Sequence, residues 1–140
     1  MIDLKPMSEA VNRLTDATRV YEELQHQVSE PARILLRSGL IQTFEYNYGL
    51  AVSMMSRYLS SVVSDPAKRD LNVFEELIRV ADEMGLVLSP FSTWKIFRQA
   101  RNNTSHTYNE AKAAAVAEVI PAFEKEVKHL LARLQEKVGS

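Results

Sequence analysis

The chain has 140 residues, with 17 Lys and Arg against 18 Asp and Glu, three His and no Cys. This length suits one domain, residues 1–140, and 46% apolar with 25% charged residues is typical of a soluble globular protein. The longest charge-free stretches, Tyr46–Ser56 and Met84–Trp94, are far shorter than the roughly 20 apolar residues of a membrane span. The absence of cysteine excludes disulfides, thiolate zinc sites and cysteine nucleophiles. With no signal-peptide-like run at the N-terminus, we expect a cytoplasmic protein.

The net charge of −1 argues against a general nucleic-acid coat, which would neutralise many phosphates with a basic face. The charges are nevertheless unevenly distributed along the chain. Residues 84–109 contain no acid but include Lys95, Arg98 and Arg101, and residues 31–64 hold three Arg and one Glu. Such basic stretches could bind a phosphate or an acidic partner protein.

Apolar spacing predicts two long helices in the first half of the chain. Pro31 is expected to open the second of them, because its fixed φ suits a first helical position, and this helix continues to about Val63. Gly39 and Gly49 inside it either weaken the helix or allow a close helix neighbour. One face of the first helix is expected to carry Val11, Leu14, Thr18, Tyr21 and Val28.

Turn and cap residues divide the rest of the chain into shorter helices. Ser64-Asp65-Pro66 predicts a break, and Asn72–Glu75 matches a capping box at the start of a third helix. Gly85 is expected to stop that helix. Ser89-Pro90 predicts the cap and first turn of a fourth helix, which ends near Arg101.

The last predicted helix carries a long apolar stripe, interrupted by Pro121, which should kink or split it. Thr107 with Glu110 matches a second capping box and predicts that this helix starts at Thr107. No segment alternates with a period of two. The sequence therefore predicts an all-α, up-and-down bundle of four or five helices around one core.

The polar run Asn102–Thr107 is the candidate functional segment. Such residues are costly inside a helix and favoured at its ends, so the run predicts a break between two helices. It places Arg101 at the end of one helix and His106 just ahead of the next. An Arg can grip phosphate oxygens in a two-pronged manner, and a His can transfer a proton near neutral pH. The pair could act on a phosphodiester without a metal, and no acid or His cluster has metal-ligand spacing. The alternative is a capped helix start with a surface Arg and a partly buried His.

The stretch Arg101–Glu110 closely resembles the R-N-x-T-S-H-T-Y-x-E signature of HEPN proteins, once described as nucleotidyltransferase substrate-binding subunits. These proteins are now seen as the toxin half of HEPN–MNT toxin–antitoxin pairs, a type VII-like system. Residues Gly39–Tyr48 are similar to the family's I-Q-x-F-E-x-x-Y helix, and Gly85-Leu86 followed by Trp94 also fits. Gly49–Ser53 departs from the family pattern, which often reads Glu-Leu-x-Trp-Lys there.

The resemblance implies a HEPN-like bundle that dimerises and acts as a metal-independent endoribonuclease with no cofactor. It implies that His106 transfers protons, that Arg101 stabilises charge at the phosphorus centre, and that Asn102 orients the phosphate or supports His106. The implied partners are an RNA substrate, such as tRNA or mRNA, and an MNT-type nucleotidyltransferase antitoxin. That antitoxin would transfer AMP from ATP to Tyr108, which would block RNA binding.

Three functions stay open from the sequence alone. The first is the ribonuclease toxin, the second a noncatalytic substrate-binding subunit of a two-component nucleotidyltransferase, and the third a helical scaffold dimer whose motif is only a capped turn. Lys95 and Arg98 are interpreted as solvated helix charges, and Glu45, Tyr46 and Tyr48 are expected to pack or to form dimer contacts.

Overall fold

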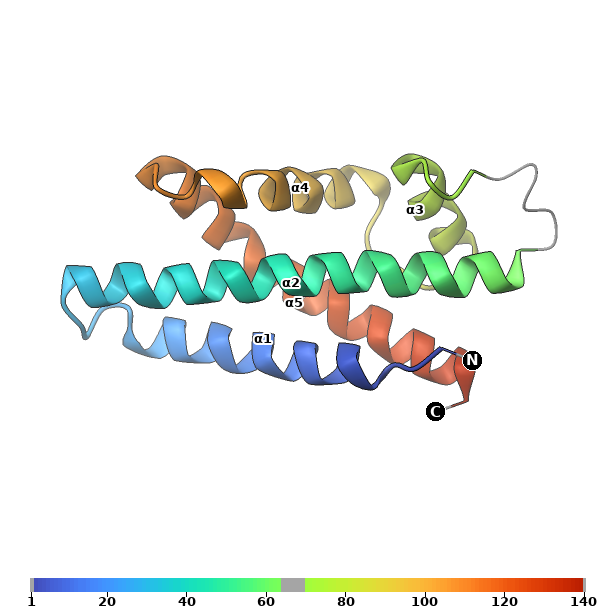
Figure 1. Cartoon of the computed structure of the whole chain (residues 1–140), viewed down its shortest axis with the longest axis horizontal. Helices are drawn as coiled ribbons and strands as arrows, with labels where there is room; N and C mark the ends of the chain where they lie inside the picture. The colour runs from blue at the N-terminus through green and yellow to red at the C-terminus, as the bar shows by residue number, and fades with distance from the viewer. Residues whose placement is uncertain (1, 64–69, 140) are drawn as a thin grey trace.

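The computed structural model of the chain describes residues 2–63 and 70–139, which fold into an all-helical bundle (Figure 1). Within these residues there is no β-strand, so the predicted all-α class is confirmed. The predicted break at Ser64-Asp65-Pro66 lies outside the described residues. The helices are α1 (Lys5–Leu24), α2 (Glu30–Val62), α3 (Phe74–Glu83), α4 (Phe91–Asn102) and α5 (Glu110–Val138), with a 3-10 helix, η2 (Thr104–His106), before α5.

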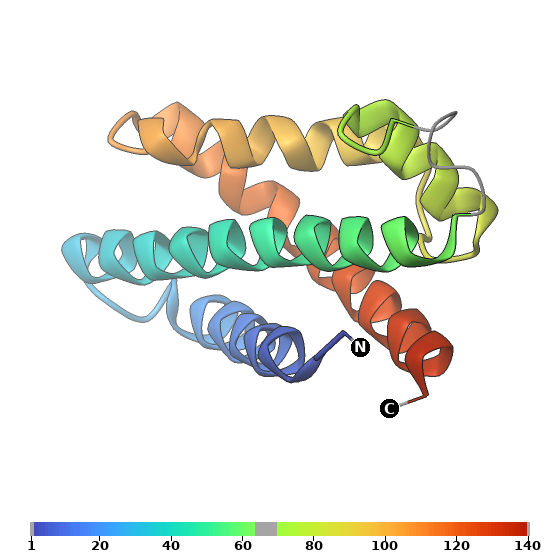
Figure 2. The same ribbon diagram turned by 45° about the vertical axis from the view of Figure 1, so that its right-hand side comes forward.

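The 33-residue helix α2 is the central element of the bundle. Helix α1 packs along one side of it and α4 lies on the other, while α5 crosses behind α2 and contacts α1, α2 and α4 (Figures 1 and 2). The C-terminal end of α4 and the N-terminal end of α5 therefore meet at one end of the molecule. The polar motif lies at that junction.

An aromatic cluster joins α2, α4 and α5 in the core. The Phe123 ring makes an edge contact with Phe44 at a centroid distance of 5.0 Å and with Phe97 at 5.3 Å. Phe97 in turn contacts Trp94 at 5.4 Å. All four side chains are fully buried, so this cluster sets how α4 lies against α5.

The start of α2 lies within one residue of the predicted start, whereas α1 ends earlier than predicted. Ser29 caps α2 by accepting a hydrogen bond from the Ala32 N–H at 3.3 Å, and Pro31 lies in the first turn. Helix α1 ends at Leu24, so the prediction that Val28 belongs to its helical face is wrong. The apolar spacing continues past Leu24, but the backbone turns there to reach α2.

Two of the predicted N-caps are wrong by one residue. Helix α3 has Val73 at its N-cap with no side-chain bond, because the Asn72 N–H donates to the Asp70 carboxylate at 3.0 Å. Pro90 itself, rather than Ser89, is the N-cap of α4. In both places the chain enters the helix one residue later than the pattern predicts. The predicted stop at Gly85 is confirmed, with φ at +72°.

Helix α5 also begins later than predicted. Its N-cap is Asn109, whose side chain accepts from the Lys112 N–H at 3.1 Å. The Thr107 hydroxyl instead donates to the Thr104 carbonyl at 3.2 Å, so the capping box at Thr107 is not formed. Pro121 does not split α5, which runs through it as one helix.

Candidate active site

The predicted break between Arg101 and His106 is present as a tight turn. Arg101 lies in the last turn of α4, and His106 closes η2. The turn is built by backbone bonds: the His106 N–H donates to the Asn103 carbonyl at 3.0 Å, and the Asn109 N–H donates to the His106 carbonyl at 3.1 Å. The two residues thus lie on adjoining short elements, as the sequence predicts.

The motif side chains are open to solvent. Arg101, Asn102 and His106 are exposed, and Tyr108 is 89% exposed. The His106 and Tyr108 rings lie 6.4 Å apart, edge to face. The partly buried His of the alternative reading is therefore not present, and all four side chains are accessible to a ligand.

Glu45, from the middle of α2, is the residue that connects the parts of this site. Its Oε2 lies 3.8 Å from Arg101 Nη1 and accepts a hydrogen bond from the Thr104 hydroxyl. That hydroxyl also lies 2.8 Å from the Arg101 carbonyl oxygen. One carboxylate therefore contacts the end of α4 and the start of η2. The prediction that Glu45 packs or forms dimer contacts missed this role. The signal in the sequence was that Glu45 is the single acid among residues 31–64.

The neighbouring aromatic and basic residues differ in what they contact. Tyr48 packs in the core, and burial raises the pKa of its hydroxyl to about 12, against the opposing effect of Arg98 and Arg101. Tyr46 is 62% exposed. Arg98 lies over the Phe74 ring at 4.9 Å, so it makes a cation–π contact rather than being only a solvated charge.

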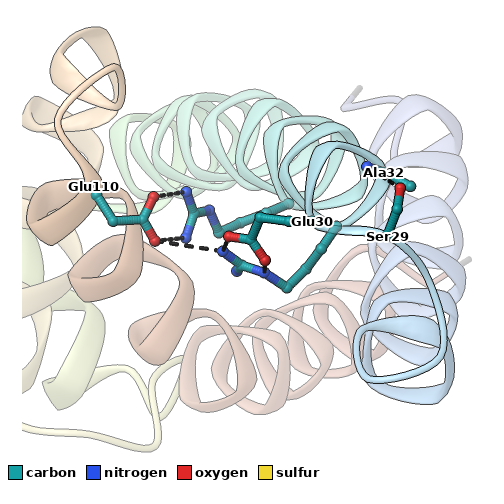
Figure 3. A network of polar contacts seen from close by, with 6 residues as sticks. Ser29, Glu30, Ala32 and Glu110 are labelled. Atoms are coloured by element: carbon teal, nitrogen blue, oxygen red, sulfur yellow. Dashed lines mark hydrogen bonds and ion pairs between the residues drawn. The ribbon is translucent and has the colours of Figure 1, made fainter.

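Glu110, the last residue of the motif, anchors α5 to α2 rather than capping the helix. It accepts two hydrogen bonds from Arg37, at 2.7 and 2.6 Å (Figure 3). Arg37 is only 4% exposed, and Arg33 beside it is bonded to Glu30 at 2.9 Å. The Arg37 guanidinium holds the pKa of Glu110 down to about 2. Sequence reasoning missed this pair, because its partners are 73 positions apart.

The Glu110 pKa predicts a pH dependence of stability. A carboxyl whose pKa is depressed from 4.5 to about 2 in the folded state stabilises the fold above pH 4.5, and this contribution is lost as the pH falls through about 2. We expect Glu110→Gln to lower the melting temperature at neutral pH and to match wild type near pH 2.

Thermal unfolding followed by circular dichroism measures both values. Glu136→Gln is the matched control, because Glu136 pairs with Arg133 on the surface and such pairs contribute little. An equal loss of melting temperature for Glu110→Gln at both pH values would contradict the assignment.

Among residues 2–63 and 70–139, no group of three or more acidic or His side chains is placed to hold a metal ion. In the same part of the chain, no helix is both long and apolar enough to cross a membrane.

The chain resembles known proteins along nearly its whole length. Residues 2–136 match the family of nucleotidyltransferase substrate binding protein like chains. The probable ribonuclease HepT of Haemophilus influenzae is 36% identical over 102 residues, which cover 73% of this chain and 69% of the relative. A solved structure from the same organism, a substrate-binding domain of a nucleotidyltransferase, superposes with a TM-score of 0.87 at 30% identity, covering 95% of this chain and 99% of that one. This chain is therefore a HepT-like member of the nucleotidyltransferase substrate binding protein like family.

Proposed function

We propose that the chain is a metal-independent endoribonuclease toxin whose active site is the exposed turn between α4 and α5. The observation that carries this proposal is the placement of Arg101 and His106 on adjoining elements, both open to solvent. The name of the Haemophilus relative, a probable ribonuclease, supports the same reaction class.

The proposed chemistry is attack of an RNA 2′-hydroxyl on the adjacent phosphorus. His106 takes the proton from the 2′-hydroxyl, the new P–O2′ bond forms, the P–O5′ bond breaks, and the proton ends on the leaving 5′-oxygen. Arg101 neutralises the charge that develops on the phosphoryl oxygens, and the exposed Asn102 amide orients them. Glu45 positions the Arg101 guanidinium through their 3.8 Å contact.

We also propose that the protein works as a homodimer through α2. An exposed stripe at three- and four-residue spacing runs along this helix without a charge, and it includes Leu35 at 74% exposure and Tyr46. Among the described residues, no atom lies within 4 Å of a Cβ atom added at Gly39 or Gly49, so neither glycine serves close packing between these parts of one chain. The stripe consists of Leu35, Gly39, Gln42, Tyr46, Gly49 and Ser53. Sedimentation velocity is expected to give twice the 15.9 kDa of one chain.

Tyr108 is the proposed point of control by a nucleotidyltransferase antitoxin. In this step the Tyr108 oxygen attacks the α-phosphorus of ATP, pyrophosphate leaves, and the phenolic proton passes to solvent. The near-complete exposure of Tyr108 leaves its hydroxyl accessible, and its ring lies beside His106. The added phosphate would bring negative charge to the turn and oppose RNA binding.

Cleavage of total RNA and tRNA by the purified protein in EDTA tests the proposed activity. We expect cleavage that EDTA does not abolish, and dependence on a divalent ion would overturn the metal-free mechanism. An intact-mass spectrum must accompany the assay, because protein that already carries AMP on Tyr108 would not cleave RNA.

A second function is favoured by the family description and by the solved relative, which is a nucleotidyltransferase substrate-binding domain. In that case the chain would present a substrate to a separate nucleotidyltransferase and cut nothing itself. A stable complex with such an enzyme, together with unmodified protein that does not cleave RNA, would favour this alternative.

A further inference from the structure

Tyr48 lies beside the proposed active site, one turn of α2 after Glu45. Its side chain is 7% exposed, and its ring packs against Phe44 and Phe123. Among the described residues its hydroxyl makes no hydrogen bond, and its oxygen is not fully buried. Because the pKa of this hydroxyl is raised to about 12, it stays protonated at neutral pH. The Tyr48 hydroxyl is therefore an unused hydrogen-bond donor at the surface of the core.

Two arginines of α4 lie close to this hydroxyl. Helix α4 runs antiparallel to α2 (Figure 1), and Arg101 contacts Glu45 at 3.8 Å. One turn back along α4, Arg98 therefore lies beside the residue one turn forward along α2, which is Tyr48. The pKa of Tyr48 agrees with this placement, because the charges of Arg98 and Arg101 both oppose its rise. A neutral donor is thus next to two cationic ones.

The charge of Arg98 is not neutralised by a carboxylate. Its guanidinium lies over the Phe74 ring at 4.9 Å, and within the described ranges it makes no ion pair and no hydrogen bond. Residues 84–109 contain no acid, so α4 offers it no carboxylate at helical spacing. Glu45 is engaged by Arg101 and by the Thr104 hydroxyl. The ring contact holds the Arg98 guanidinium in place while its N–H donors stay available.

A protonated phenol and an unpaired guanidinium on one side of α4 supply hydrogen-bond donors and positive charge. The ligand that fits such a set is an anion with several acceptor oxygens, such as a phosphodiester group. We propose that Tyr48 and Arg98 bind the RNA phosphate next to the one that Arg101 holds. This subsite rests on the proposed function, and it directs the RNA strand along α4, away from the His106 turn.

Binding of a short fluorescein-labelled single-stranded RNA, followed by fluorescence anisotropy in EDTA, tests the subsite without requiring cleavage. The variants are made in His106→Ala so that the RNA stays intact, and the intact mass shows that Tyr108 carries no AMP. Tyr48→Phe removes only the hydroxyl and is expected to weaken binding about fivefold, as for the loss of one neutral hydrogen bond. The salt dependence of the affinity should not change, because the hydroxyl is uncharged.

Arg98→Gln is expected to weaken binding about tenfold and to lower the slope of log Kd against log salt by about 0.7, because one cation is lost. Arg98→Lys keeps the charge, so the slope should be retained while the affinity falls with the two-pronged grip. Lys95→Gln is the matched control on α4. Lys95 lies over the Phe91 ring at 5.9 Å and is not among the charges that act on Tyr48. Thermal unfolding of each variant confirms that it is folded.

The outcomes separate the subsite from the cleavage reaction. Equal losses for Arg98→Gln and Lys95→Gln, with Tyr48→Phe like its parent, would indicate general attraction to RNA and would overturn the subsite, as would no RNA binding at all. With His106 restored, Tyr48→Phe and Arg98→Gln should raise KM and leave kcat nearly unchanged. If the chain cuts no RNA but both variants still weaken binding, the subsite stands and only the proposed reaction falls. Cleavage with an unchanged KM in both variants would retain the reaction and remove the subsite.

Discussion

Replacing His106 by alanine is expected to lower the rate of RNA cleavage by about 10²- to 10⁴-fold, the usual contribution of a general acid–base group. The loss should lie in the cleavage step rather than in folding, because the His106 side chain is exposed. Initial rates on a fluorescent RNA in EDTA, together with thermal unfolding, separate the two effects. His129→Ala is the matched control, since His129 lies far along α5 from the turn. Full activity in His106→Ala would remove this residue from the mechanism.

The same RNA cleavage assay with Glu45→Gln tests the residue that contacts Arg101. The amide keeps the shape and can still accept from Thr104, but it loses the charge that faces Arg101. We expect a rate between those of wild type and His106→Ala, with little change in melting temperature. A rate as low as that of His106→Ala would mean that Glu45 acts on the substrate directly.

Truncating Phe123 to alanine is expected to cost about 3–5 kcal/mol of unfolding free energy, the usual range for a buried Phe in a core. Its ring is fully buried and contacts Phe44, Tyr48 and Phe97, so a cavity would open where three helices meet. Urea unfolding followed by circular dichroism gives the value. Ile96→Ala, at a position 55% exposed on α4, should change stability far less. A loss for Phe123→Ala no larger than that of Ile96→Ala would contradict the central place of this cluster.

Helix content was predictable from the sequence because it depends on apolar residues that recur at helical spacing, as they do along α1 and α5. Helix starts were less predictable, since a capping pattern competes with nearby turn bonds, as at Asn72. The motif residues were recognisable because they are contiguous. Their anchors were not, since Glu45 and Thr104 are 59 positions apart and Arg37 and Glu110 are 73 apart. Such pairs depend on how helices cross, which local spacing does not encode.

The turn that carries His106 is fastened to the same helix on both sides. Glu45 holds its entry and Arg37 holds its exit, and both belong to α2. The exposed side chains between these anchors, such as Ser105 and Tyr108, contribute little to the stability of the fold. If the turn is the active site, as proposed, mutations there would alter which molecules it binds while the scaffold stays the same. Under the proposed function, a few surface positions would therefore set the target while the architecture is kept.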